Sequence, residues 1–330
     1  MARYLITGIA GFIGSALARA LVSEGHQVRG VDNLSTGKTE NLNGMADRID
    51  FSKADVLDEA AMLSACRDID FVLHQAAIPS VVSSIHDPMA THRANADGTV
   101  NLLLAARNSG VKRVIYASSC AAYGDAELPN REEMRPRPLS PYAVSKIAGE
   151  FYMDSFYRVY GLETVSLRYF NVFGPQQDAD SEYSGAIAKF IRMMVQGKTP
   201  TIFGDGEQSR DFTFVENVVA ANILACTAPG EKVAGQVFNI GSGSRITVNR
   251  VYRTIQTLLN SPGDPIHAPA RAGEIKHSYA DISLASEKLG YVPHVTFEEG
   301  MKRTVDWFQA TMEPASGAGR ATDLNPRPSA

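Results

Sequence analysis

This chain of 330 residues has little cysteine, no large excess of charge of either sign and no long apolar run. Its three cysteines, Cys66, Cys120 and Cys226, lie far apart without a Cys-x-x-Cys pair, and its seven histidines show no ligand spacing. These absences argue against a disulfide framework and a metal site. The formal net charge of −4 predicts no surface for nucleic acid or for an anionic membrane.

No stretch approaches the roughly 18 apolar residues that a membrane-spanning helix needs. Residues 1–8 run into a strand-like segment without the layout of a signal peptide. We therefore expect a cytoplasmic protein, since isolated cysteines suit a reducing compartment. A hydrophobic content of 44% is ordinary for a globular chain, and 330 residues are enough for a large core and two lobes.

Short apolar runs alternate with longer helix-patterned stretches through the first half of the chain. Buried strands are predicted at residues 3–7, 27–31, 70–74, 111–118 and 164–168, and helices at 12–24, 59–66, 88–108 and 141–160. Repeated strand–helix–strand units imply right-handed crossovers, so we expect an α/β fold with a Rossmann-type doubly wound parallel sheet. Ligands of such sheets bind at the carboxyl ends of the strands.

After residue 168 the pattern is looser. The sequence predicts a helix at 184–196, a strand–helix unit at 211–228, a strand at 237–240 and helices at 248–259, 283–289 and 297–309. We expect a Rossmann domain at 1–168, to which 211–240 return, and a smaller mixed α/β substrate-binding lobe at 169–210 and 241–312. Residues 313–330, rich in Ala, Gly, Pro and Ser, are expected to be a disordered tail.

A glycine-rich turn follows the first predicted strand. Gly8, Gly11 and Gly14 open the next helix, where small residues let a pyrophosphate approach the backbone and the helix N-terminus. A Gly-x-x-Gly-x-x-Gly run alone could be a tight turn, but Asp32 at the end of the second strand strengthens the interpretation. A carboxylate there accepts hydrogen bonds from the adenosine ribose and repels a 2′-phosphate, which favours NAD over NADP.

Two further strand ends suit a bound dinucleotide. Asp55-Val56 follows a third strand, expected between the strands at 27–31 and 70–74, and could flank the adenine, although a solvated turn is nearly as common a role for such an Asp. Gln75-Ala76-Ala77 ends the fourth strand, and its small residues leave room for the cofactor. His74, just before them, is interpreted as a packed strand-end residue rather than as a base.

Tyr142 and Lys146 lie four residues apart on one face of a predicted helix. A phenol loses its proton near pH 10, so work at neutral pH requires a stabilised phenolate, which an ammonium and a cationic nicotinamide ring would provide. Ser118 and Ser119 end the preceding strand and place hydroxyls at the same edge of the sheet. Ser119, Tyr142 and Lys146 together predict a general acid/base site beside a redox cofactor.

These motifs make residues 3–309 resemble the extended short-chain dehydrogenases/reductases, and more narrowly the UDP-glucose and UDP-N-acetylglucosamine 4-epimerases. The resemblance rests on the glycine motif, Ser119 four residues before Tyr123, Tyr142-x-x-x-Lys146, and the runs at 168–175, 204–206 and 210–212. It implies NAD-dependent epimerisation at C4 of a UDP-hexose through a 4-keto sugar. Tyr142 would act as the base while Ser119 holds the sugar oxygen.

The resemblance also implies further ligand contacts. For the cofactor these are Phe12, Ile13, Asn33, Asn95 and Tyr169, together with Tyr142 and Lys146. For the UDP-sugar they include Asn171 and Glu274. Arg210 and Arg271 are expected to bind the diphosphate, because a guanidinium matches phosphate in a bidentate way.

Ser278 takes the position that borders the sugar's C2 substituent in the resembling epimerases, where a bulky Tyr closes the pocket to N-acetyl groups. The small Ser predicts room for UDP-N-acetylglucosamine and UDP-N-acetylgalactosamine, and the smaller UDP-glucose and UDP-galactose also fit. Ser80, the first hydroxyl of the run at 80–84, is expected to line the same pocket.

Two departures help to choose the reaction. Cys120 and Ala121 replace the Asp-Glu pair of related dehydratases, and the Glu of related decarboxylases is absent. A UDP-glucuronate 4-epimerase stays an alternative. So does a non-catalytic NAD-binding regulator, which has no need of the Ser, Tyr and Lys together. The resemblance also implies a homodimer, in which the helices at 88–108 and 141–160 pack against the same pair of a partner. The alternative is that these helices are buried within the monomer.

Overall fold

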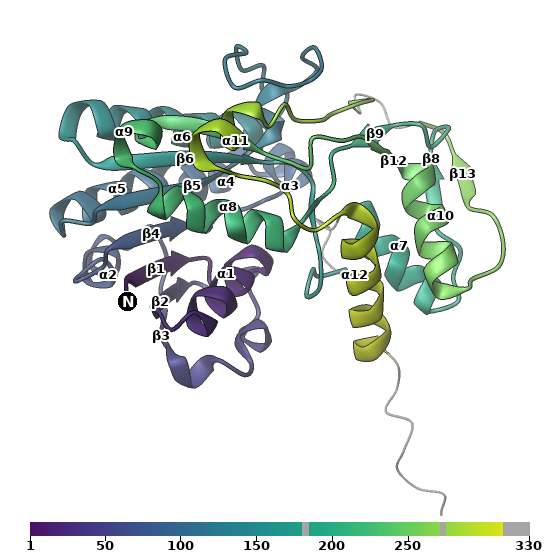
Figure 1. Cartoon of the computed structure of the whole chain (residues 1–330), viewed down its shortest axis with the longest axis horizontal. Coiled ribbons are helices and arrows are strands. Elements are labelled where there is room, and N and C mark those ends of the chain that lie inside the picture. Colours follow the sequence, from purple (N-terminus) through teal and green to yellow (C-terminus); the bar gives the residue numbers. More distant parts are fainter. Residues whose placement is uncertain (180–184, 271–274, 313–330) are drawn as a thin grey trace, which may run out of the picture.

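A seven-stranded parallel sheet forms the centre of the chain (Figure 1). The computed structural model describes residues 1–179, 185–270 and 275–312. The strand order is β11-β6-β5-β4-β1-β2-β3, which confirms the predicted doubly wound parallel sheet. The strands are β1 (Arg3–Thr7), β2 (Gln27–Asp32), β3 (Ile49–Lys53), β4 (Phe71–His74), β5 (Arg113–Ser119), β6 (Glu163–Tyr169) and β11 (Gln236–Ile240).

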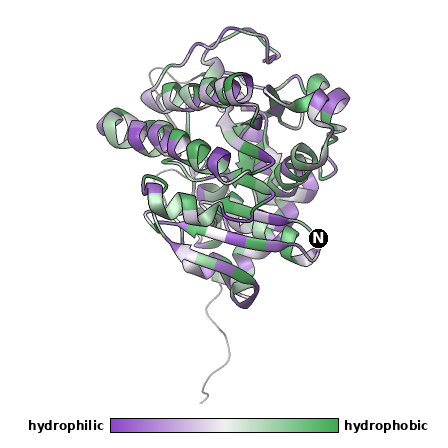
Figure 2. Cartoon of the chain, turned by 90° about the vertical axis from the view of Figure 1, so that its left-hand side faces the viewer, coloured by the Kyte–Doolittle hydropathy of each residue, from purple (hydrophilic) through white to green (hydrophobic). Residues whose placement is uncertain are grey.

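Helices cover both faces of this sheet, which explains why its strands read as continuous apolar runs. One face packs against α1 (Phe12–Ser23), α8 (Val215–Thr227) and α11 (Ser283–Leu289), and the other against α2 (Glu59–Ala65), α5 (Gly98–Asn108) and α6 (Pro141–Tyr160). Ile6 and its neighbour Leu5 on β1 enter opposite cores, as the twofold side-chain period of a strand requires. Figure 2 shows the strands predominantly hydrophobic and the helices with both characters.

A second hydrophobic core lies beside the sheet, among α7 (Ala186–Val195), α10 (Val248–Leu259) and α12 (Phe297–Met312) (Figure 1). Three two-stranded sheets accompany the seven-stranded sheet. They are β7 (Val172–Phe173) with β10 (Thr213–Phe214), β8 (Thr201–Phe203) with β13 (Ile266–Ala268), and β9 (Ser209–Arg210) with β12 (Ile246–Thr247). The domain boundaries inferred from the sequence stay a prediction, and the expected tail at 313–330 lies outside the described residues.

The predicted helix at 88–108 has the bounds that the structure shows, but it is not α-helical throughout. The structure has α4 (Pro88–His92), a π-helical segment η3 (Arg93–Asp97) and then α5, and a short helix α3 (Val81–His86) precedes them. The π segment turns the Asn95 side chain toward the preceding loop. The remaining short helices are η1 (Thr39–Leu42), η2 (Ala46–Arg48), η4 (Cys120–Tyr123) and α9 (Gly230–Val233).

The strand order reverses between β1 and β4, which is where an open α/β sheet has its ligand crevice. The β1–α1 turn and the β4–α3 loop lie on either side of this point. Within the described residues, none of the helices is both long and apolar enough to cross a bilayer.

Candidate active site

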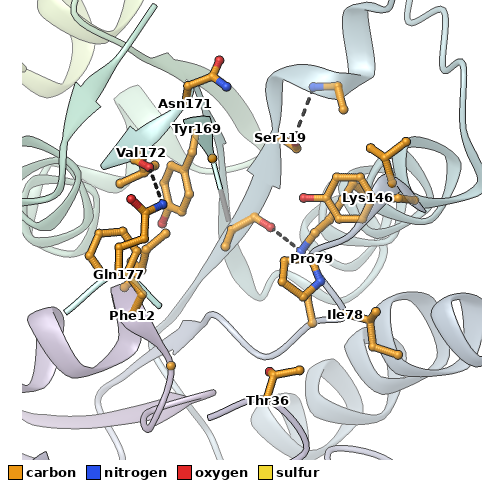
Figure 3. Close-up of a pocket in the computed structure, with 18 of the residues that line it drawn as sticks. Phe12, Thr36, Ile78, Pro79, Ser119, Lys146, Tyr169, Asn171, Val172 and Gln177 are labelled. Carbon is orange, nitrogen blue, oxygen red and sulfur yellow. Dashed lines mark hydrogen bonds between the residues drawn. The ribbon is translucent and has the colours of Figure 1, made fainter. Parts of the chain in front are cut away.

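A cavity of about 1630 Å³ opens at the carboxyl ends of the central strands and extends to α7 and β8 (Figure 3). This volume exceeds the ~300–1,000 Å³ typical of pockets for one drug-sized ligand, so a dinucleotide and a second nucleotide fit together. Most of the predicted site residues line it: Gly8, Gly11, Phe12, Ile13, Gly14, Asp32, Asn33, Asp55, Val56, Gln75, Ala76, Ala77, Ser119, Tyr142, Lys146, Tyr169, Asn171, Arg210 and Ser278.

The turn between β1 and α1 has the geometry of an anion site. Gly11 is the N-cap of α1, and no side chain caps the helix, so its first backbone N–H groups point outward without side-chain partners. Gly8 adopts a φ of +71°, and a Cβ on Gly14 would lie 2.1 Å from the Gly8 carbonyl oxygen. The glycines therefore let the helix start close against the strand and present its positive end to the cavity.

Acidic and amide side chains after β2 and β3 form the next part of the wall. The Asp32 carboxylate accepts backbone N–H bonds from Ala10 at 2.9 Å and Leu34 at 2.8 Å, which fix its orientation. Burial raises the pKa of Asp32, while these two hydrogen bonds oppose the shift. The Asn33 amide donates to Asp55 at 2.8 Å and so joins two predicted cofactor-binding residues. An uncapped helix start, a glycine cradle and a fixed carboxylate together fit NAD.

Figure 3 shows Ser119 and Lys146 across the cavity from Phe12, and Tyr142 lines the same cavity. Ser119 is the last residue of β5, and α6 begins just before Tyr142, where Ser140 caps the helix by accepting from the Ala143 N–H at 3.1 Å. Pro141 occupies the first turn of that helix. Local capping therefore decides where α6 starts and which face carries Tyr142 and Lys146.

The pKa values of this group follow from burial. Burial raises the pKa of Tyr142 to about 12, with the Ser119 hydroxyl opposing the shift. Burial also lowers the pKa of Lys146 to about 7, although the charge of Glu150 opposes it. The Lys146 ammonium donates to the Ala117 carbonyl at 2.8 Å. A phenol in this position needs added positive charge to ionise near neutral pH.

His74 does not serve as a base in this geometry. It is buried, with its ring nitrogens bonded to the Thr7 and Thr99 hydroxyls at 2.7 and 3.0 Å. Burial and the nearby Lys146 charge lower the pKa of His74 to about 3, so it is neutral at physiological pH. These contacts agree with the interpretation of His74 as a packed strand-end residue.

Asn95 does not line the cavity, contrary to expectation. Its buried amide bonds the Ile78 backbone N–H at 2.8 Å and carbonyl at 3.2 Å, and donates to the Ser145 hydroxyl at 3.0 Å. Ser145 in turn donates to the Tyr142 carbonyl at 2.8 Å. Asn95 therefore connects the loop after β4 with the start of α6, beneath the residues that line the cavity.

Tyr169 ends β6 in register with Ser119 and reaches the cavity beside Gln177 (Figure 3). Its hydroxyl is held by Asn222, whose amide donates at 2.8 Å, and by Gln75 at 3.2 Å. Burial raises the pKa of Tyr169 well above its usual range, while these hydrogen bonds oppose the shift. The ring is thus a fixed, neutral surface rather than a proton carrier.

The substrate end of the cavity contains only part of the predicted set. Asn171, Arg210 and Ser278 line it, and Arg210 also donates to the Ser209 carbonyl at 2.9 Å. The Ser278 N–H donates to the Ser209 carbonyl at 3.1 Å, which holds the Ser278 backbone against β9. Arg271 and Glu274 lie outside the described residues.

The expectation that Ser80 lines the pocket is not met. Ser80 is buried, and its hydroxyl caps α3 by accepting from the Ser83 N–H at 2.9 Å. Ser84 is also buried and donates to the Val81 carbonyl at 2.6 Å. The hydroxyls of the 80–84 run serve the helix, and the side chains of Val81 and Val82 form the cavity wall instead.

Sequence reasoning overlooked one buried carboxylate near the site. Glu150 lies two turns after Tyr142 on the same face of α6 and pairs with Arg168 on β6. The four-residue spacing of Tyr142, Lys146 and Glu150 could have revealed it, because residues so spaced share a helix face. The described residues contain no group of three or more His, Cys, Asp or Glu side chains that could hold a metal.

Comparison with known proteins agrees with this geometry. The family model for the NAD dependent epimerase/dehydratase family matches residues 4–241. A UDP-glucose 4-epimerase of Mycolicibacterium smegmatis is 38% identical over 312 residues, which are 93% of this chain and 98% of that protein.

Two solved structures are similar over nearly the whole chain. A UDP-glucose 4-epimerase of Thermotoga maritima with UDP-glucose has a TM-score of 0.89 and 39% identity, covering 94% of this chain and 100% of that one. A UDP-N-acetylglucosamine 4-epimerase of Methanobrevibacter ruminantium with UDP-N-acetylmuramic acid has a TM-score of 0.90 and 40% identity, with coverages of 94% and 99%. The chain therefore belongs to the NAD-dependent epimerase/dehydratase family, among its NAD-dependent nucleotide-sugar 4-epimerases.

Proposed function

We propose that this enzyme interconverts UDP-N-acetylglucosamine and UDP-N-acetylgalactosamine at C4, and that it also accepts UDP-glucose and UDP-galactose. The observation that carries the proposal is Ser278, a small residue in the wall of the cavity that also contains Ser119 and Tyr142. A bulky side chain there would fill space that an N-acetyl group needs. The similarity to an epimerase named for UDP-N-acetylglucosamine supports the same substrate class.

The residues of the site divide the proton chemistry among them. Tyr142, as a phenolate, removes the proton of the sugar 4-hydroxyl while the Ser119 hydroxyl holds that oxygen. The glycine turn and Asp32 would hold NAD, which would supply a reversible acceptor for the hydride of C4. The Lys146 ammonium stabilises the phenolate, and Tyr142 finally returns its proton to the C4 oxygen. The three residues end each turnover unchanged.

Arg210 is proposed to bind the diphosphate, with Asn171 contacting the sugar nucleotide beside it. Both line the cavity, and they belong to other elements than the glycine turn, since Arg210 is on β9 and Asn171 follows β6. The UDP part is therefore proposed to have an anion site of its own. Arg271 and Glu274 stay predicted partners of the diphosphate and of the nucleoside ribose.

The substrate proposal is tested first with the purified protein and no added cofactor. UDP-N-acetylglucosamine, UDP-glucose and UDP-glucuronate are offered separately, and their 4-epimers are separated by chromatography. Conversion of the N-acetylated sugar supports the open pocket. Conversion of UDP-glucose alone keeps the chemistry but contradicts the pocket argument, and conversion of UDP-glucuronate alone contradicts the hexose assignment.

Replacement of Ser278 by Tyr should then narrow the substrate range. We expect kcat/KM for UDP-N-acetylglucosamine to fall by about 10- to 200-fold, because lost pocket volume acts on the C2 substituent, while UDP-glucose keeps most of its rate. Ser278→Ala is the matched control, since it keeps the pocket open and should leave both rates nearly unchanged. Equal losses on the two substrates in Ser278→Tyr would mean that Ser278 does not border C2.

We further propose that the enzyme is a homodimer through α6. Val144, Phe151 and Val159 form one apolar stripe on the solvent side of this helix, and Phe151 is 66% exposed. Large apolar side chains exposed along one face of a helix are typical of association surfaces. The proposal commits to a second copy of the same chain, as the family resemblance implies.

Phe151→Asp should convert the dimer into a monomer, because it places a charge in the apolar stripe. Sedimentation velocity at micromolar concentration measures the change. Val292→Asp is the control, since Val292 is equally exposed at 66% but lies after α11, away from α6. A wild-type protein that sediments as a monomer would refute the α6 interface.

A further inference from the structure

Glu150 is a buried carboxylate that the proton chemistry described above does not use. Its side chain is only 6% exposed, and that of Arg168 only 4%. The two are joined by a bidentate pair, with the Arg168 Nε at 2.8 Å from Oε1 and an Nη at 2.7 Å from Oε2. The Ser118 hydroxyl also donates to Glu150. Burying a carboxylate costs free energy unless it is paired, and here Arg168 and Ser118 provide its partners.

Glu150, Arg168 and Ser118 connect three elements that contribute residues to the site. Glu150 lies on α6 with Tyr142 and Lys146, Ser118 precedes Ser119 on β5, and Arg168 precedes Tyr169 on β6. The helix lies very close to the sheet here, because a Cβ on Gly149 would be 2.3 Å from the Tyr116 hydroxyl. That hydroxyl also donates to the Lys146 carbonyl at 3.3 Å. A shift of α6 along the sheet would therefore break several contacts at once.

Lys146 lies one helical turn before Glu150, on the same face. The Lys146 ammonium is buried and donates to the Ala117 carbonyl at 2.8 Å, which is a neutral partner. It also lies 5.1 Å from the centre of the Tyr116 ring. A buried ammonium loses hydration, and a nearby negative charge is what favours its protonated form.

We propose that Glu150 is a positioning residue of this epimerase, which holds α6 in register with Ser119 and keeps Lys146 in its ammonium form. The proposal rests on the acid/base roles given to Tyr142 and Lys146. Glu150 does not line the cavity. It acts through the charge on Lys146 and through the position of α6 against the sheet. Arg168 and Ser118 satisfy its oxygens, so its effect on Lys146 acts through space rather than through a hydrogen bond.

The charges around Lys146 give the sign of the expected effect. His74 on β4 is neutral, and burial keeps Tyr116 on β5 protonated by raising its pKa. Tyr142 on α6 is also protonated before the cofactor binds. Arg168 on β6 pairs with Glu150 and lies near Glu132, whose pKa burial raises. Glu150 is the group that opposes the fall in the pKa of Lys146 to about 7.

The test is the pH profile of kcat in Glu150→Gln. The fraction of Lys146 that is an ammonium falls as pH rises through its pKa, and removal of the carboxylate charge lowers that pKa. The limb where kcat falls with rising pH should therefore move to lower pH, by on the order of one pH unit. Glu150→Asp keeps the charge but shortens the side chain, so it should keep the wild-type profile with a reduced kcat.

Two further variants keep the test decisive. Glu150→Gln leaves Arg168 buried without a carboxylate, so the double variant Glu150→Gln/Arg168→Met removes both charges and should fold. Its limb should move in the same direction but by less, because loss of the Arg168 cation opposes loss of the Glu150 carboxylate at Lys146. Glu163→Gln is the structural control, because Glu163 pairs with the buried Arg113 on β5 without reaching Lys146. A wild-type pH profile in an active double variant would overturn the proposal while leaving the epimerase assignment intact.

Discussion

Tyr142→Phe is expected to lower kcat by about 10²- to 10⁴-fold, the range that a positioned general acid/base contributes. The substitution removes only the hydroxyl, and the half-buried ring stays between Ser119 and the helix. Burial has already raised the pKa of Tyr142 to about 12, so the hydroxyl works only where positive charge is added beside it. We expect the variant to keep its bound NAD, because the glycine turn and Asp32 are untouched.

The measurement is kcat with UDP-N-acetylglucosamine together with the NAD content of the purified protein. Tyr152→Phe is the matched control, since Tyr152 lies on the same helix but is exposed to solvent. It should behave as wild type in both measurements. Undiminished turnover in Tyr142→Phe would refute the proposed mechanism, and loss of NAD from that variant would assign the hydroxyl to cofactor binding instead.

Local signals in the sequence were enough for the central sheet and for α6. Most strands of the sheet are buried on both faces, so their apolar runs are visible in the sequence. The edge strand β3 is largely exposed and has no such run. Helix α6 begins at a Ser-Pro cap and ends at Gly161 with a φ of +72°, both of which are local chemistry. Once α6 and β5 are placed, the meeting of Ser119 with Tyr142 follows from the topology alone.

Long-range contacts explain what the sequence could not predict. The π segment at η3 has no proline or glycine before Gly98, and it fits the bonds that Asn95 makes to Ile78 and Ser145, far away along the chain. The role of Ser80 was missed because a hydroxyl can either cap a helix or face a ligand, and only the presence of α3 decides between them. The two-residue strands β7, β9, β10 and β12 are too short for any periodicity.

Gly14→Ala is expected to weaken NAD binding by tenfold or more, a second large effect. Gly14 lies in the first turn of α1, where an added Cβ would meet the Gly8 carbonyl oxygen at 2.1 Å and the Ile9 Cα at 2.9 Å. Both neighbours are backbone atoms of the turn, so the clash is relieved only if α1 moves away from β1. Such overpacking costs about 1–3 kcal/mol, and it acts where the helix N-terminus must meet the pyrophosphate.

The NAD content of the purified variant and its activity with and without added NAD measure this effect. Gly110→Ala is the control: Gly110 has a φ of +70° in a turn where a Cβ would have no neighbour within 4 Å. It should cost about 1–2 kcal/mol of stability through backbone strain while leaving the NAD content unchanged. If Gly14→Ala loses NAD but regains turnover when NAD is supplied, the substitution weakens only NAD binding at the glycine turn between β1 and α1. A Gly14→Ala protein with full NAD would mean that the turn can open without losing the cofactor, and the anion site would then have to be assigned elsewhere.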